Sequence, residues 1–165
     1  MEQKKTERIN RILTHPSYIE YVSQNAEKEQ DRVFCHHDMG HFLDVARLAE
    51  ILNLTEAYGQ DAELIYAAAL LHDIGRHIQY ETGEDHALVS ARMAPAILKD
   101  CGFMQEETEQ IVSAIATHRL AAVRDRKDLN GLLYRADKLS RPCYCCKQES
   151  ACNWKGDKKN RQLIW

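Results

Sequence analysis

The pair His72-Asp73 is the clearest sign of chemistry in the sequence, because it directly follows the apolar run from Ile65 to Leu71. A run of this kind predicts a buried helix, and a buried carboxylate needs a counter-charge, a hydrogen-bond donor or a metal ion. Imidazole beside carboxylate suits divalent ions of the first transition series. We therefore interpret the pair as part of a metal site.

Further candidate ligands stand on other predicted helices, and with the pair they make a set of six. One ion would be held by His41, His72, Asp73 and Asp137. The second oxygen of Asp73 could bridge to another ion, held by His86 and His118. Such a centre, with one or two ions among Fe, Mn, Co, Ni and Zn, favours hydrolysis by a metal-activated water.

Each of these residues taken alone has a simpler interpretation. An inward histidine such as His118 is often a hydrogen-bonded core residue. Asp137 could form an ion pair with Arg135 or Arg141, and His86 could lie on the surface. The placement of all six at inward or helix-end positions favours the metal interpretation.

The elements that position these residues are predicted to be helices, since apolar residues recur three and four apart and β-branched alternation is almost absent. The first two helices cover about 4–13 and the residues after Pro16. Asp38 and Asp61 cap the next two, and Gly75 ends the second of these just past the ligand pair.

The second half of the chain continues the all-α pattern. A polar connection from Arg76 to Asp85 leads into a helix that carries His86 in its first turn and ends at about 100–102. Another helix begins near Glu106 and carries His118, and the last covers about 128–140. We expect one helical domain over residues 1–141 and a Cys-rich basic tail over 142–165.

Composition narrows the possible functions. With 165 residues, 44% of them hydrophobic, the chain is long enough for one domain with an adequate core. A net charge of −3 argues against a nucleic-acid partner, and no apolar run approaches the roughly 20 residues of a membrane span. Cysteines without a secretory signal indicate a cytoplasmic protein with reduced thiols. Nothing in the sequence indicates an oligomeric state.

The tail contains a cysteine cluster of its own, formed by Cys143, Cys145, Cys146 and Cys152. The C-x2-C spacing could bind a structural zinc or an iron–sulfur centre, but it is irregular and no second C-x2-C completes it. Free thiols are the other interpretation. Cys35 and Cys101 are predicted to be ordinary small residues of the core.

Three segments between Arg32 and Ser140 resemble the HD superfamily of metal-dependent phosphohydrolases. They are His-Phe-Leu-Asp-Val-Ala-Arg-Leu-Ala from His41, Ala-Leu-Leu-His-Asp-Ile-Gly around the pair, and Arg-Ala-Asp-Lys-Leu around Asp137. The resemblance implies an all-helical fold around a metal site, and it maps the family signature onto His41, His72, Asp73 and Asp137. His86 and His118 match the extra histidines of members with two metals.

Other residues near the ligands are predicted to bind the substrate or a metal. Arg76, which stands where some members have lysine, His77 and Lys138 could neutralise substrate phosphate. The catalytic candidates are therefore Asp73, Arg76 and Lys138. His37, one turn before His41, could reach the second metal.

We expect a small phosphoester as substrate, a nucleotide above all. The alternatives are a di-iron oxygenase on the same scaffold and a nucleotide sensor without catalytic activity. No Gly-Tyr-Pro tripeptide is present, which disfavours the cyclic-dinucleotide phosphodiesterase branch of the family.

Overall fold

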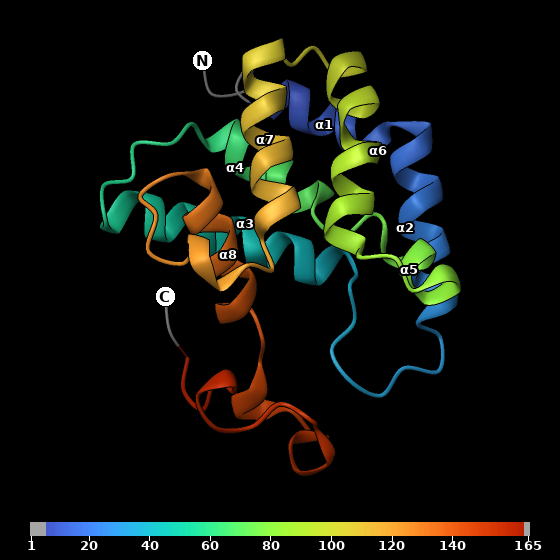
Figure 1. The fold of residues 1–165 in the computed structure, drawn as a ribbon, viewed down its shortest axis with the longest axis vertical. Helices are drawn as coiled ribbons and strands as arrows, with labels where there is room; N and C mark the ends of the chain where they lie inside the picture. The colour runs from blue at the N-terminus through green and yellow to red at the C-terminus, as the bar shows by residue number, and fades with distance from the viewer. Residues whose placement is uncertain (1–5, 164–165) are drawn as a thin grey trace.

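The structure, a computed structural model, describes residues 6–163 of the chain, and all regular structure in that range is helical, as predicted (Figure 1). The α-helices are α1 (Glu7–Thr14), α2 (Pro16–Lys28), α3 (Met39–Thr55), α4 (Ala62–Leu71), α5 (Arg76–Thr82), α6 (His86–Asp100), α7 (Gln105–Thr117) and α8 (Leu129–Leu139). Short 3-10 turns are η2 (Ala121–Val123), η3 (Cys143–Cys145), η4 (Glu149–Ala151) and η5 (Gly156–Lys158). The predicted helix start at Lys4 lies outside the described residues.

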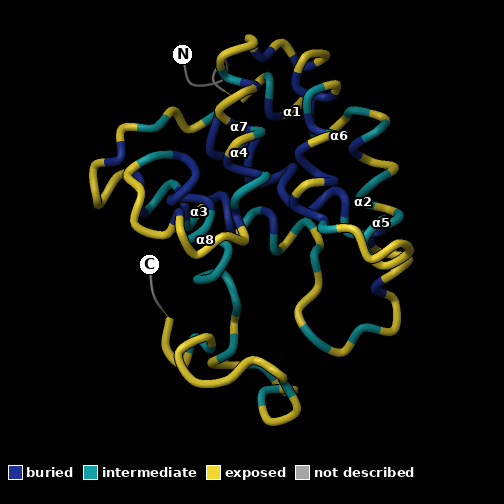
Figure 2. The backbone as a smooth tube through the Cα atoms, in the orientation of Figure 1, coloured by how far each residue is buried: buried dark blue, intermediate teal, exposed yellow. Residues whose placement is uncertain are grey.

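Helix α4 forms the centre of the core. Its residues from Ala67 to Leu71 are completely buried, and it packs against α1, α3, α7 and α8 (Figure 2). A helix that is apolar on all sides is stable only when neighbours cover it all round. Because His72 and Asp73 follow this helix directly, they are carried into the interior and are themselves buried.

Aspartate caps fix where the helices begin. The Asp38 carboxylate accepts a hydrogen bond of 3.0 Å from the backbone N–H of His41. Asp61 caps α4 in the same way, as predicted, and Asp85 and Asp128 cap α6 and α8. These caps satisfy backbone donors that the first helical turn leaves free, and they thereby set the rotation of each ligand-bearing helix.

The segment after the ligand pair differs from the prediction. Most of the expected connection Arg76–Asp85 is the helix α5, and Gly75 stands at its N-terminus with φ −88° instead of closing α4 in a left-handed conformation. A Cβ atom on Gly75 would lie 2.6 Å from Cγ1 of Val89. Glycine is therefore required here because α6 passes so close to the chain.

Beyond α8, as far as residue 163, the tail has only the 3-10 turns η3 to η5, and none of these turns contains a buried residue (Figure 2). Cys101 is buried, as predicted, but the prediction for Cys35 is wrong: it is exposed, in the loop between α2 and α3. Of the helices that the structure describes, none combines the length and the apolar character needed to cross a bilayer.

Candidate metal centre

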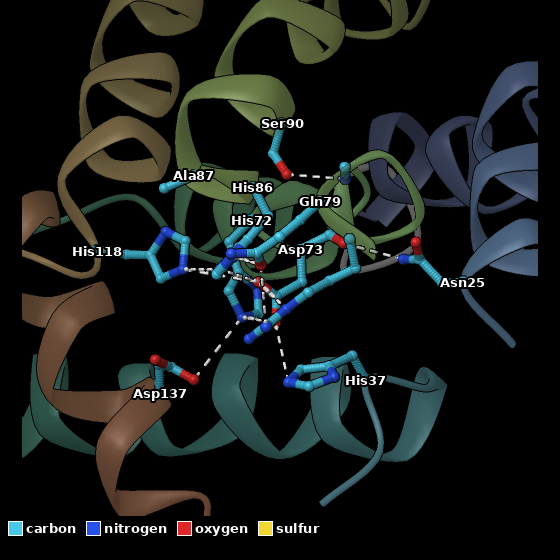
Figure 3. Close-up of polar contacts among 12 residues, drawn as sticks. Asn25, His37, His72, Asp73, Gln79, His86, Ala87, Ser90, His118 and Asp137 are labelled. Atoms are coloured by element: carbon cyan, nitrogen blue, oxygen red, sulfur yellow. Dashed lines mark hydrogen bonds and ion pairs between the residues drawn. The ribbon is translucent and has the colours of Figure 1, made fainter. Parts of the chain in front are cut away.

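The structure brings the six candidate ligands together at the end of α4. Figure 3 shows His72, Asp73, His86, His118 and Asp137 among them. The six come from five separate parts of the fold, and the central pair, His72 and Asp73, directly follows α4. The others are His41 on α3, His86 on α6, His118 at the end of α7 and Asp137 on α8.

Asp73 lies between two pairs of imidazoles. Its Oδ2 atom lies 3.3 Å from Nε2 of His72 and 3.6 Å from Nε2 of His41. Its Oδ1 atom lies 3.0 Å from Nε2 of His86 and 3.6 Å from Nε2 of His118. In each group of three, the ligand atoms lie within 4.8 Å of one another. The two oxygens of one carboxylate thus face two separate histidine pairs.

Asp137 belongs to the side of His41 and His72. Its Oδ1 atom lies 3.6 Å from Nε2 of His41 and 3.9 Å from Nε2 of His72. Its other oxygen forms an ion pair with Lys138. Arg135, which the sequence offered as an ion-pair partner of Asp137, forms an ion pair with Glu56 instead.

Hydrogen bonds hold three of the imidazoles with Nε2 pointing inward. His72 and His118 each donate Nδ1–H to the backbone carbonyl three residues earlier, at 2.7 and 2.6 Å. His86 donates Nδ1–H to the side-chain oxygen of Gln79 at 2.6 Å. An imidazole that donates through Nδ1 in its neutral form carries a lone pair on Nε2, which is the arrangement seen in metal-ligating histidines.

This donor set fits a divalent metal. The two Nε2 atoms of His41 and His72 are 3.3 Å apart, and so are those of His86 and His118. Two facing lone pairs repel each other, whereas a shared cation would accept both. Oδ1 of Asp73 is buried and makes no hydrogen bond to the described residues, although nitrogen atoms surround it. The geometry is therefore suited to borderline cations on either side of Asp73.

Electrostatics give the site the protonation states that metal ligands need. Burial alone would raise the pKa of Asp73, but Arg76 and His72 outweigh it and hold the pKa well below the ordinary 3.8. Burial would likewise raise the pKa of Asp137, but Lys138 and the neighbouring histidines outweigh it and lower this pKa. Burial lowers the pKa of His86 to about 4, against the opposing effect of Asp73. At neutral pH the carboxylates are charged and His86 is neutral.

A second layer of polar residues supports the site, and sequence reasoning missed most of it. His37 lies with Nε2 3.8 Å from Oδ2 of Asp73, on the side of His41, so its predicted place at the second metal is wrong. Its Nδ1 pairs with the buried Glu29, which also accepts a hydrogen bond of 2.6 Å from Tyr80. Although burial acts to raise it, these bonds lower the pKa of Glu29 to about 2.

Asn25 on α2 fixes the turn that carries the ligand pair. Its amide donates to the backbone carbonyl of Asp73 at 2.9 Å, and its carbonyl accepts from the backbone N–H of His77 at 2.7 Å. The His77 ring stacks on Tyr21, with 5.8 Å between centroids, so it packs against α2 and is not among the residues that line the cavity over the site. The one sequence signal for Asn25 is its spacing of seven residues from Tyr18 on the apolar stripe of α2.

A cavity of about 790 Å³ opens above the site. Its lining includes His41, His86, His118 and Asp137, and the cationic side chains Arg32, Arg76, Arg119, Lys138, Arg141 and Lys159. Arg76 and Lys138, both catalytic candidates, are thus at the cavity wall. Nε of Arg76 also lies 3.3 Å from Oδ1 of Asp73.

Comparisons with known proteins agree with this geometry. The model of the HD domain family matches residues 38–141. An uncharacterized protein of Clostridium beijerinckii is 44% identical over 161 residues, which cover 96% of this chain and 99% of that protein. The crystal structure of a predicted HD superfamily hydrolase from an uncultured Thermotogales bacterium superposes with a TM-score of 0.60 at 27% identity, covering 86% of this chain and 80% of that one.

Ribonuclease Y proteins are also similar, over shorter stretches. The protein from Rubrobacter xylanophilus is 34% identical over 80 residues, and that from Acetivibrio thermocellus is 32% identical over 102 residues. These stretches cover 48% and 62% of this chain, but only 14% and 17% of the ribonucleases. The chain thus spans less than a fifth of the length of these two relatives.

Proposed function

Since the chain belongs to the HD superfamily of hydrolases, we propose that it is a metal-dependent phosphohydrolase that acts on a small phosphoester, a nucleotide in the first instance. The observation that carries the proposal is the position of Asp73 between two inward-facing imidazole pairs. A carboxylate so placed is suited to bridge two cations, and paired cations favour phosphoryl transfer to water.

The residues around the Asp73 carboxylate form two groups of candidate ligands. His41, His72 and Asp137 would hold one ion with Oδ2 of Asp73, and His86 and His118 a second with Oδ1. Divalent ions bound there supply Lewis acidity and lower the pKa of a water molecule.

Arg76 and Lys138 would stabilise the negative charge that develops on the phosphoryl oxygens. Both line the cavity, and both are oriented by the carboxylate beside them, Asp73 for Arg76 and Asp137 for Lys138. Preorganised cations of this kind need little rearrangement when charge develops in the transition state. Their role is therefore to orient the phosphoryl group and balance its charge.

The cavity supports a small substrate. Its volume of about 790 Å³ falls in the range of small-molecule sites, which is on the order of 300–1,000 Å³. The chain's net charge of −3 disfavours a long polyanion, since nucleic-acid binders usually carry a strong basic excess. Because some relatives are named ribonuclease Y, any substrate test should compare nucleotides with a short RNA.

The test uses protein purified without chelators under anaerobic conditions. Phosphate release is measured over a panel of nucleotides with Mn, Co, Ni or Fe added, and a short oligoribonucleotide is included. We expect turnover of at least one nucleotide, loss of turnover after metal removal, and recovery when metal is returned. Asp73→Asn should abolish turnover together with retention of the metal bound at the His/Asp site, whereas Asp125→Asn, at an exposed carboxylate away from the site, should change neither.

Three outcomes would overturn the proposal. Oxygen consumption coupled to substrate loss would assign the site to oxygenase chemistry. Nucleotide binding with no hydrolysis under any of the metals would make the protein a sensor. Cleavage of the oligoribonucleotide with no turnover of nucleotides would replace the proposed substrate class.

A further inference from the structure

The cysteines outside the core all open onto the same cavity. Cavity-lining thiols come from Cys35, Cys143, Cys145, Cys146 and Cys152. The first lies in the loop between α2 and α3, and the others lie in the tail beyond α8. Segments far apart in the sequence thus contribute thiols to one wall, outside the His/Asp cluster.

Three of these five thiols, those of Cys35, Cys143 and Cys146, lie near enough to interact electrostatically. Cys143, Cys146 and Cys152 are half-buried, whereas Cys145 is exposed and directs its thiol to the carbonyl of Pro142 at 3.5 Å. The pKa of the Cys35 thiol is raised, first by desolvation from the surrounding chain and then by the neighbouring thiols of Cys143 and Cys146. Cys35 therefore lies near the thiols of Cys143 and Cys146, whereas the Cys145 thiol has a backbone partner of its own.

The tail is ordered although it has no apolar core of its own. Its turns contain no buried residue, and its contacts are hydrogen bonds, ion pairs such as Lys159 with Glu149, and the cations of Arg141 and Lys158 over the Trp154 ring. The Asn160 amide donates to the carbonyls of Lys138, Leu139 and Arg141 at 2.9 to 3.0 Å, so the tail returns to the end of α8. Small segments that cannot bury enough apolar surface are usually held by disulfides or a metal.

The backbone around Cys143 and Cys146 forms a tight turn. Cys143 and Cys146 flank a 3-10 turn that is closed by a hydrogen bond of 3.3 Å from the backbone N–H of Cys146 to the carbonyl of Cys143. A C-x2-C pair on a tight turn directs two thiolates to one point, as zinc sites require. Cys152, directly after η4, and Cys35, from the opposite segment, would complete a tetrahedral set.

We propose that Cys35, Cys143, Cys146 and Cys152 bind a metal centre through four thiolates, separate from the His/Asp site, and that a single zinc ion is its simplest occupant. Among the described residues, the ligand groups already within 4.8 Å of one another contain only histidine and aspartate. The thiols must therefore move toward one another on binding, and each releases its proton. The centre would tie the loop that leads to His41 to the tail across the cavity mouth.

The first test is metal analysis of the full-length protein, purified anaerobically without chelators. Double replacement His72→Ala and Asp73→Ala removes the His/Asp site as a source of bound metal. In that background we expect one zinc per chain to remain. Cys35→Ser and Cys146→Ser should each weaken its retention roughly tenfold or more, and Cys145→Ser, the matched control, should leave it unchanged.

Two further readouts assign the occupant and guard against misfolding. Iron with acid-labile sulfide and visible absorption, lost in the same two serine variants, would support the four-thiolate centre with an iron–sulfur cluster as occupant. In the unsubstituted protein, a thiol reagent should react at once with Cys145 and with the other cavity thiols only after a strong chelator is added. Immediate reaction of all five thiols, or equal metal content in Cys35→Ser and its parent, would overturn the proposal.

Discussion

Replacement of Asn25 by alanine tests whether α2 fixes the ligand-bearing turn. The side chain is buried, with 1% of its surface exposed, and it satisfies one backbone carbonyl and one backbone N–H of the segment from Asp73 to His77. Alanine would leave both groups buried without a partner. The turn would then be free to move relative to α2.

The expected loss of stability follows from these two bonds. A buried polar group left without a partner costs about 1–3 kcal/mol, so the loss of two partners in Asn25→Ala should lower the free energy of unfolding by roughly 2–6 kcal/mol. Since the free energy of unfolding of such a domain is about 5–15 kcal/mol, the variant should still fold. Metal affinity should fall as well, because the backbone of Asp73 loses its anchor.

Urea denaturation followed by circular dichroism measures the first effect, and metal titration of the folded variant measures the second. Asn10→Ala, at an exposed position of α1, is the matched control and should change stability by less than about 0.5 kcal/mol. An Asn25→Ala protein as stable as this control, with unchanged metal affinity, would refute the assignment of Asn25 as the anchor of the turn.

Further predictions concern packing, acid stability and metal removal. Gly75→Ala should destabilise the protein by about 1–3 kcal/mol in urea, because its Cβ would overlap Val89; an unchanged midpoint would contradict the close approach. The hydrogen bond from Arg8 lowers the pKa of Glu107 below the ordinary 4.5, so this pair stabilises the protein above that pH and loses its effect as pH falls through the lowered pKa. Denaturation from pH 7 to 3 should therefore show a deficit of about 1 kcal/mol for Arg8→Ala that shrinks in acid, and a deficit independent of pH would refute this linkage. Chelator treatment should lower the melting temperature, because bound metal stabilises the folded state only, and calorimetry with and without added metal checks this.

Much of the fold could be predicted because local signals and burial agreed. The Asp38, Asp61 and Asp128 caps begin the expected helices, and the all-apolar α4 is at the centre. The convergence of the six candidate ligands followed from their types and their inward positions. Capping and periodicity are local properties, so one sequence is enough to find them.

The features that sequence reasoning missed depend on contacts between distant segments. Gly75 reads as a helix stop, and only the close passage of α6 shows why glycine stands there. Glu29 and Asn25 support the site from α2 and its C-terminal end, and their residue types alone do not distinguish them from solvated polar residues. The residue type of Cys35 predicts a core position, whereas its place at the cavity depends on the tail, which returns to the end of α8.

The most direct test of the central claim is anomalous diffraction from crystals of the protein loaded with manganese or iron. We predict two peaks that flank the Asp73 carboxylate, one in contact with His72 and the other in contact with His86. Anomalous density that touches neither oxygen of Asp73, in a protein that still requires metal for turnover, would contradict the claim.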